Sequence, residues 1–265
     1  MLGGDSIDSL FDNWKDVLAA LYNNGLKLKG PKTKIAPTST EILGWIWNNG
    51  YITAGKHKIS PLITCHPPVT VTALRSYVGA FKVFNRIIRG CSELLCELEK
   101  FMSGKKKCEK LVWTDTMLKV FKAAQNALSQ ISIIALPSPS DQLIIVHDGS
   151  KSGIGSVLYL KRSDAMKLGG FFSARLKVHQ KLWLPCEIEA LSIAASVTHF
   201  GPYITQSYHR TQILTDNRPC VQAWGKMKRG EFSSRARVSS FMSVLSQYDI
   251  DVQFIKGEFN LPSDF

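Results

Sequence analysis

Short apolar runs alternate with helical segments over residues 142–265, and this alternation limits the folds open to the chain. The pattern predicts three strands, a helix, a strand, further helices and a final strand near residues 251–256. Successive strands can pair as hairpins, whereas a parallel strand that follows a helix requires a crossover. We therefore expect an α/β domain, built as a mixed sheet with helices on its faces.

Four carboxylates lie where these elements are expected to begin or end, namely Asp148, Glu189, Asp216 and Asp264. Two apolar runs, 143–147 and 213–215, are each followed directly by an aspartate. Glu189 lies in the helical stretch 186–200, where an ionised carboxylate among apolar residues is costly unless it is paired or metal-bound. Carboxylates that converge at strand ends supply the hard oxygen ligands that a two-Mg²⁺ phosphodiesterase site needs.

The chain has 265 residues, 45% of them hydrophobic, and a formal net charge of +12. Residues 1–140 carry 18 Lys and Arg against 10 Asp and Glu, so the basic excess is concentrated in the first half. Such an excess suits a polyanion such as nucleic acid, although a merely soluble basic surface also explains it. No apolar run reaches the length of a membrane span, and the N-terminus is unlike a signal peptide. We therefore expect an intracellular protein, neither secreted nor bound to a membrane.

The first half of the chain is expected to be mainly helical. Its expected elements are an amphipathic helix over 7–21, a β-hairpin over 42–53, a helical block over 71–102 broken near Gly90, and a helix over 114–128. The hairpin rests on Asn48-Asn49-Gly50, which is typical turn chemistry between two apolar runs. The Pro- and Ser-rich segment 136–140 is a plausible linker to the second half.

The four carboxylates occur in an order that resembles the RNase H domain of retroelement reverse transcriptases, most closely that of gypsy-type long-terminal-repeat retrotransposon polyproteins. The segments that carry the resemblance are Asp148-Gly149-Ser150, Cys186-Glu187-Ile188-Glu189-Ala190-Leu191, Thr215-Asp216-Asn217 and Pro262-Ser263-Asp264. The resemblance implies that Asp148, Glu189, Asp216 and Asp264 are catalytic and hold two Mg²⁺ ions, for which Mn²⁺ can substitute.

Each member of this series also has a structural interpretation. Asp-Gly-Ser alone is more often a turn, and Asp216, followed by Asn217-Arg218-Pro219, can cap a helix. Glu187 competes with Glu189 for the helical position, which the family pattern assigns to Glu189. All four carboxylates in order, with matching elements between them, favour the catalytic interpretation.

Segments of the first half resemble the same family. They are Leu43-Gly44-Trp45, similar to the primer grip, residues 72–79, similar to the thumb helix that follows a template–primer duplex, and Trp113-Thr114-Asp115, similar to the connection. In the thumb-like helix, Gly79 lets the backbone approach a duplex, and Arg75 and Lys82 can contact phosphates. A contact between helices explains Gly79 almost as well.

Five further basic residues are candidates for contact with nucleic acid: Lys105, Lys106, Lys107, Arg235 and Arg237. The three lysines follow Gly104 in a segment that is expected to be an exposed loop. The two arginines precede the last long helix. A solvated loop or helix face explains each group equally well.

One departure from the family concerns DNA synthesis. These polymerases hold two metals with an Asp-Asp pair and an upstream Asp, and the chain contains no Asp-Asp. The resemblance therefore implies a fragment that lacks the fingers, most of the palm and the integrase portion, with no polymerase activity expected. The chain also stops one residue after Asp264, so we expect the family's final helix to be missing and this carboxylate to be loosely held.

We expect four regions: a palm remnant with a primer-grip-like hairpin (1–60), thumb and connection helices (61–128), a linker (129–141) and an RNase H-like domain (142–265). The expected activity is Mg²⁺-dependent endonucleolysis of the RNA strand of RNA–DNA hybrids. The alternative is a non-catalytic remnant that binds duplex nucleic acid without cutting it.

Overall fold

The computed structural model describes residue 4, residues 6–35 and residues 37–259, and it divides the chain into two compact units after Thr38. The first unit contains the helix α1 (Ile7–Asn23) and the short 3-10 helix η1 (Gly30–Lys32). The predicted amphipathic helix is confirmed, and it begins at Ser6, whose side chain accepts a hydrogen bond from the backbone N–H of Ser9. None of the described helices is both long enough and apolar enough to cross a membrane.

The second unit opens with a four-stranded antiparallel sheet. Its strands, in spatial order, are β1 (Ser39–Ile42), β2 (Trp45–Asn48), β3 (Tyr51–Ala54) and β4 (Ile134–Ala135). The β2–β3 hairpin turns at Asn49-Gly50, as the sequence predicts, with positive φ at both residues. The predicted strand over 42–47 is wrong in one respect. Leu43 and Gly44 have φ values of 53° and 79° and form a second tight turn, so the primer-grip-like segment comprises this turn and Trp45, the first residue of β2.

Four helices form the helical region that follows: α2 (Lys56–Thr64), α3 (Val71–Lys82), α4 (Cys91–Lys100) and α5 (Asp115–Ser129). They surround a core of buried aromatic and aliphatic side chains, among them Leu74, Phe81 and Phe121. The predicted break lies between α3 and α4, where Gly90 has a φ of 63° that suits glycine. The sequence therefore predicts α3, α4 and α5 from apolar periodicity and punctuation, whereas α2 is not among the expected elements.

A five-stranded mixed sheet carries the second core. Its strands are β5 (Gln142–Gly149), β6 (Gly153–Arg162), β7 (Ala165–Arg175), β8 (Thr211–Thr215) and β9 (Ile250–Phe254). Their spatial order is β7-β6-β5-β8-β9, with antiparallel pairs up to β5 and parallel pairs beyond it. The accompanying helices are η2 (Val178–Leu182), α6 (Pro185–Gln206), α7 (Arg218–Lys228), α8 (Ala236–Leu245) and η3 (Gly257–Phe259).

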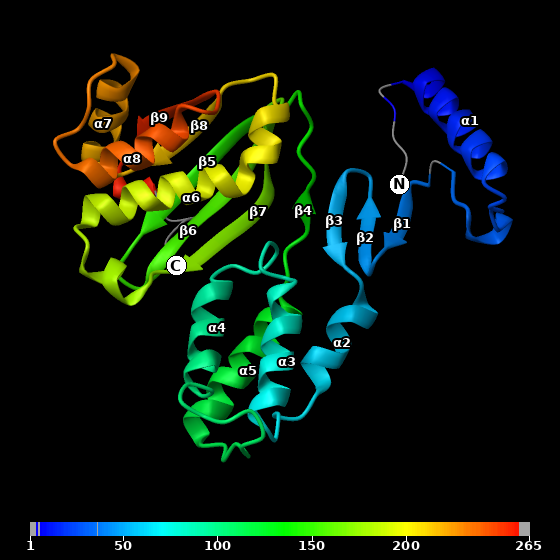
Figure 1. The fold of residues 1–265 in the computed structure, drawn as a ribbon, viewed down its shortest axis with the longest axis horizontal. Coiled ribbons are helices and arrows are strands. Elements are labelled where there is room, and N and C mark those ends of the chain that lie inside the picture. The colour runs from blue at the N-terminus through cyan, green and yellow to red at the C-terminus, as the bar shows by residue number, and fades with distance from the viewer. Residues whose placement is uncertain (1–3, 5, 36, 260–265) are drawn as a thin grey trace. The chain divides into compact units, whose positions relative to one another are not determined.

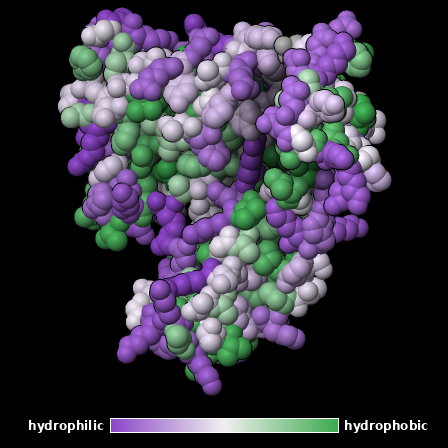
Figure 2. Space-filling view, turned by 45° about the vertical axis from the view of Figure 1, so that its right-hand side comes forward, coloured by the Kyte–Doolittle hydropathy of each residue, from purple (hydrophilic) through white to green (hydrophobic). Residues whose placement is uncertain are grey.

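Helix α6 is the crossover between β7 and β8 and lies across the five-stranded sheet (Figure 1). Its buried residues, such as Ile193 and Val197, share one core with Leu143 and Ile145 of β5. The expected α/β class, a mixed sheet with flanking helices after a mainly helical region with a hairpin, is confirmed. On the face shown in Figure 2, hydrophobic side chains reach the surface in patches between hydrophilic ones.

The helical region docks on β7, the edge strand of the five-stranded sheet. The backbone N–H of Phe171 donates to the carbonyl of Arg86 (2.9 Å), and Ser92 bonds to Ser173 through its backbone N–H and its hydroxyl. The Arg86 guanidinium donates to the Tyr203 hydroxyl and lies over the Tyr203 ring. Strand β7 has a bulge at Gly169 and Gly170 beside this contact. A Cβ on Gly170 would lie 3.1 Å from the Arg86 side chain, so glycine allows the close approach.

The predicted linker 129–141 contains β4 and ends at an ion pair whose carboxylate is buried. Asp141, with a side chain only 1% exposed, accepts two hydrogen bonds from Arg162 at 2.8 and 2.7 Å and one from the Ser138 N–H. The structure also groups residues 39–54 with the elements that follow them. The four expected region boundaries themselves stay predictions.

We expect Asp141→Ala to lower the free energy of unfolding by about 2 kcal/mol, because it leaves the Arg162 charge and the Ser138 N–H without their acceptor. Hydrogen bonds from Arg162 lower the Asp141 pKa, so its stabilisation is present above its unfolded pKa and is lost as pH falls through the folded pKa. Urea denaturation at neutral and acidic pH measures this effect. The control is Asp249→Ala, which breaks an exposed pair with Arg210 and should lower stability much less than Asp141→Ala. Equal losses in the two variants would contradict the structural role given to Asp141.

Candidate active site

The register between β5 and β8 brings two of the predicted carboxylates together. These strands are parallel neighbours, with Ile144 opposite Gln212 and Val146 opposite Leu214. Asp148 and Asp216 each lie two residues beyond the last of these pairs, at the carboxyl ends of adjacent strands. The local structure also excludes the two structural alternatives, a turn at Asp148 and a helix cap at Asp216. Asp148 lies inside β5 rather than in a turn, and Asn217, not Asp216, accepts the hydrogen bond that caps α7.

Close packing of α6 against the end of β5 brings Glu189 to the same place. A Cβ on Gly149 would lie 3.1 Å from the carbonyl oxygen of Ile188, so only glycine lets the strand approach this helix without a shift. The Ser192 hydroxyl, one turn further along α6, donates to the Asp148 carbonyl at 2.7 Å. The glycine of the Asp-Gly-Ser motif is therefore a packing requirement, and it places Glu189 beside Asp148.

The electrostatics of Glu189 reflect this crowding. Glu189 is only 8% exposed. Its burial, together with the nearby charges of Asp148 and Asp216, raises the Glu189 pKa to about 8. Its Oε2 atom is buried and has no hydrogen-bond donor among the described residues. His147 Nδ1 lies 3.5 Å from this oxygen, but burial lowers the His147 pKa to about 3. At neutral pH the imidazole is thus neutral, and a Glu189 pKa of about 8 leaves this carboxyl mostly protonated as well.

These features bear on whether the residues fit a divalent cation. Three carboxylates supply hard oxygen ligands, and a buried carboxylate oxygen without a donor suits a cation. Among the described residues, however, no three Asp, Glu, His or Cys side chains are already gathered as a metal-binding group. The fourth predicted carboxylate, Asp264, lies outside the described residues. The chemical type of the donors fits Mg²⁺, and the residues available to hold it are Asp148, Glu189 and Asp216.

Glu187, the competing glutamate of α6, has a different environment. Its Oε2 atom accepts a hydrogen bond from the Leu184 N–H at 3.1 Å, at the start of the helix. Arg237 lies 3.3 Å from the same carboxylate and also stacks over the Trp183 ring. Both glutamates have a backbone N–H donor, Leu184 for Glu187 and Gly149 for Glu189. Glu187 also has a cation beside it, whereas Glu189 faces other carboxylates. This contrast supports the assignment of the site position to Glu189, and it gives Arg237 internal contacts that the sequence does not predict.

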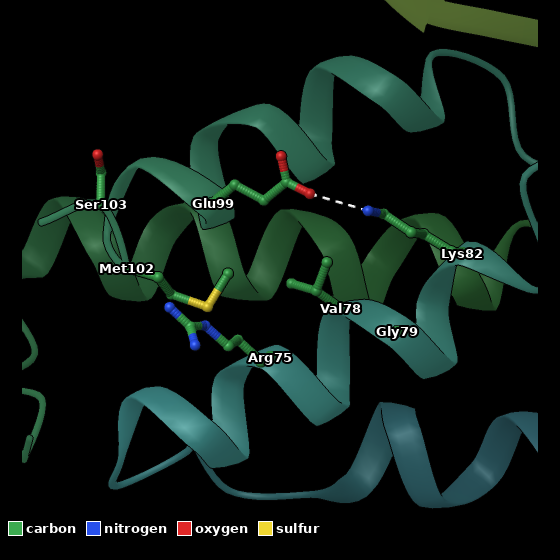
Figure 3. A pocket seen from close by; sticks show the side chains of 7 residues that line it. All are labelled: Arg75, Val78, Gly79, Lys82, Glu99, Met102 and Ser103. Atoms are coloured by element: carbon green, nitrogen blue, oxygen red, sulfur yellow. Dashed lines mark hydrogen bonds and ion pairs between the residues drawn. The ribbon is translucent and has the colours of Figure 1, made fainter. Parts of the chain in front are cut away.

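A second group of predicted residues lines a hollow of about 410 Å³ on the helical region, here called the basic hollow. Its lining residues are Arg75, Val78, Gly79, Lys82, Glu99, Met102 and Ser103 (Figure 3). A Cβ on Gly79 would meet nothing within 4 Å, so the structure gives no helix–helix contact that requires this glycine. Arg75 and Lys82 lie on the same exposed side of α3, as the sequence predicts.

The remaining basic candidates do not line that hollow, although the three lysines closely follow Ser103, one of its lining residues, in the chain. Lys106 and Lys107 are exposed, while Lys105 is half-buried with its Nζ atom 3.9 Å from Glu109. Arg235 is exposed at the start of α8. The structure reveals one residue that sequence reasoning missed: Arg175, at the end of β7, donates to Glu99 of the basic hollow at 2.7 Å. No sequence signal links them, because 76 residues separate the two.

The strand order, the crossover helix and the carboxylates at adjacent strand ends define an RNase H-like fold with an acidic site. Residues 113–213 match the family model described as "RNase H-like domain found in reverse transcriptase". The chain is 22% identical over 251 residues to the Tf2-3 and Tf2-4 transposon polyproteins of Schizosaccharomyces pombe. This alignment covers 94% of the chain and 18% of each polyprotein, so the chain spans about a fifth of the curated relatives it matches. The resemblance to gypsy-type retrotransposon polyproteins is confirmed.

Solved structures of the foamy viral protease-reverse transcriptase share the fold. One, in complex with double-stranded DNA, has a TM-score of 0.75 at 13% identity and covers 96% of this chain and 44% of its own. Another, in complex with RNA/DNA hybrid, has a TM-score of 0.74 at 13% identity and covers 96% of this chain and 34% of its own. The similarity thus extends over the helical region as well as the five-stranded sheet.

We expect opposite stability effects from the two glutamates of α6 when both are changed in metal-free buffer. Glu189→Gln should raise the free energy of unfolding by about 1 kcal/mol above pH 8, because it removes a buried charge among carboxylates. The raised pKa means that the penalty is absent below the unfolded pKa and grows as pH rises toward the folded value. Glu187→Gln should lower stability by about 1 kcal/mol, since it weakens a cap and an ion pair. Urea titrations in EDTA test both variants, and changes of the same sign would contradict the electrostatic contrast.

Proposed function

We propose that the chain is a Mg²⁺-dependent RNase H-type endonuclease that cleaves the RNA strand of RNA–DNA hybrids. The observation that carries this proposal is the convergence of Asp148 and Asp216 at adjacent parallel strand ends, with the buried Glu189 beside them. Burial of Glu189 near the charges of Asp148 and Asp216 is unfavourable for stability alone, which favours a role with a cation. The chemical type of the ligands matches metal-assisted phosphodiester hydrolysis.

The proposed mechanism assigns distinct tasks to these residues. Asp148, Glu189 and Asp216 would hold the metals, and Asp264 is proposed to complete the set. Bound Mg²⁺ ions would activate a water as nucleophile and stabilise the leaving oxygen. The protein fixes the geometry through Gly149, whose contact with α6 sets how closely the strand end approaches Glu189. Ser192 holds the Asp148 backbone in place from the same helix.

We expect Asp148→Asn to reduce hybrid cleavage by more than about 100-fold. Residues that only hydrogen-bond to a metal ligand already contribute up to about 100-fold to activity, and a direct ligand should contribute more. The substitution keeps the side-chain volume and removes the charge, so the thermal unfolding midpoint should not fall. The matched control is Asp164→Asn, an exposed aspartate in the β6–β7 turn at the opposite end of the sheet. The measurement is cleavage of a labelled hybrid with Mg²⁺ and with EDTA. Equal cleavage by wild type and Asp148→Asn would refute the assignment, and binding without cleavage by wild type would favour the non-catalytic alternative.

The proposed partner is duplex nucleic acid, and the basic hollow is the surface proposed to contact it. The support comes from Arg75 and Lys82 on an exposed helix face, and from the open space around Gly79. The foamy viral structures, with 13% identity, were determined with double-stranded DNA and with RNA/DNA hybrid. Phosphate contacts from such basic side chains position a duplex without reading its sequence.

Gly79→Ala separates this role from a structural one. Because nothing lies within 4 Å of the added Cβ, the substitution should raise the free energy of unfolding by about 0.5–1 kcal/mol through helix propensity. It should also weaken hybrid binding if a duplex backbone approaches the glycine. Gly225→Ala in α7, whose added Cβ would meet only Arg229 at 3.8 Å, is the control for the propensity gain. Chemical denaturation and fluorescence anisotropy measure the two effects. Increased stability with unchanged binding would exclude close approach at this position.

A further inference from the structure

Glu99 is placed against a local rule of helix electrostatics. It lies in the last turn of α4, where the negative end of the helix dipole disfavours a carboxylate. Two cations offset this arrangement: Lys82 of α3 lies 3.0 Å from Oε1, and Arg175 of β7 lies 2.7 Å from Oε2. The carboxylate therefore joins the helical region to the five-stranded sheet through two ion pairs that use different oxygens.

Glu99 lies at a position that an anion from solution can reach. Its side chain is 30% exposed and borders the basic hollow, where Figure 3 shows Lys82 extending toward it. Arg75 also lines the hollow, and it has no acidic partner in the part of the chain that the structure describes. The floor includes the buried side chains of Val78 and Met102, so the basic groups surround a shallow apolar surface.

We propose that Glu99 is an internal substitute for a nucleic-acid phosphate: a phosphate of a bound duplex displaces it and takes over both Lys82 and Arg175. This inference rests on the proposed binding of duplex nucleic acid and adds a competing group within the site. Exposed ion pairs are weak, so their exchange is readily reversible. A phosphate also offers more acceptor oxygens than a carboxylate, and arginine can bind it with two parallel hydrogen bonds.

The exchange has two consequences. One backbone phosphate is held by residues from both the helical region and the edge strand β7, so the duplex is positioned relative to both. In addition, the displaced carboxylate lies beside the phosphate without its partners and must take up a cation from solution. Binding by the wild type therefore releases about one cation fewer than binding by a variant without this charge.

The test compares Glu99→Gln with Glu97→Gln. Glu97 lies two residues earlier on the same helix, forms an ion pair with Lys100 and does not line the hollow. Both substitutions change the net charge equally. Fluorescence anisotropy with a labelled RNA–DNA hybrid in EDTA gives affinities without cleavage, so a failure of the proposed nuclease activity does not affect the result. Thermal unfolding confirms that each variant is folded.

We expect Glu99→Gln to bind the hybrid about threefold more tightly than wild type and to steepen the slope of log affinity against log salt by about one. Glu97→Gln should change neither value as much. In a protein that already carries Lys82→Ala and Arg175→Ala, adding Glu99→Gln should give no such gain in affinity. Equal gains in the two glutamine variants, or a gain that persists without Lys82 and Arg175, would show a general charge effect and overturn the proposal.

A second comparison separates a duplex from a small anion. Inorganic phosphate is titrated against wild type and Glu99→Gln, with thermal unfolding as the readout. We expect no Glu99-dependent stabilisation at phosphate concentrations that match the nucleotide concentration of the saturating hybrid. A stabilisation equal to that given by the hybrid would assign the position to free phosphate and overturn the duplex assignment.

Discussion

The parallel register between β5 and β8 is the constraint on which the candidate site depends. Parallel neighbours require a crossover, and α6 supplies it while covering the sheet. The register then fixes Asp148 and Asp216 at the same edge, because each follows its last paired residue by two positions. A shift of one residue in β8 would turn Asp216 to the opposite face of the sheet. Hydrophobic burial of α6, β5 and β8 in one core specifies the register, so the acidic site follows from core packing.

The same packing makes the site electrostatically unfavourable in the absence of a cation. Gly149 allows α6 to approach closely, and the approach buries Glu189 beside two other carboxylates. Such an arrangement lowers stability, and evolution commonly accepts this at functional positions. Glu187, two residues earlier in the same helix, has an arginine and a backbone N–H as partners and carries no comparable penalty. Two glutamates in one helix thus have opposite roles, set by their surroundings.

The junction between the helical region and β7 is the second feature that determines how the molecule can act. An exposed edge strand invites pairing with other chains, and here the turn around Arg86 and the start of α4 cover part of that edge. The contact also fixes the basic hollow relative to the five-stranded sheet, with Arg175 and Glu99 at their boundary. A duplex that binds both would therefore meet one continuous surface rather than two independently placed parts.

The sequence alone determines much of the fold. Apolar periodicity predicts α1, α3 and α5, Asn49-Gly50 predicts the β2–β3 turn, and the order of strands and helices predicts the mixed sheet. These features depend on local spacing and turn chemistry, which a single chain segment carries. The sequence does not predict the turn at Leu43-Gly44, because a leucine at positive φ has no reliable local signal.

The family pattern in the sequence already favours Glu189 over Glu187. The tertiary structure adds the physical reason, since β5 and α8 bring different groups near these two side chains. Only it shows that Gly79 faces open space, that Arg237 is held by Glu187, and that Arg175 joins the basic hollow. Burial, charge crowding and contacts between distant segments are properties of the folded arrangement. They depend on which segments meet across the core, and local sequence spacing does not encode those distances.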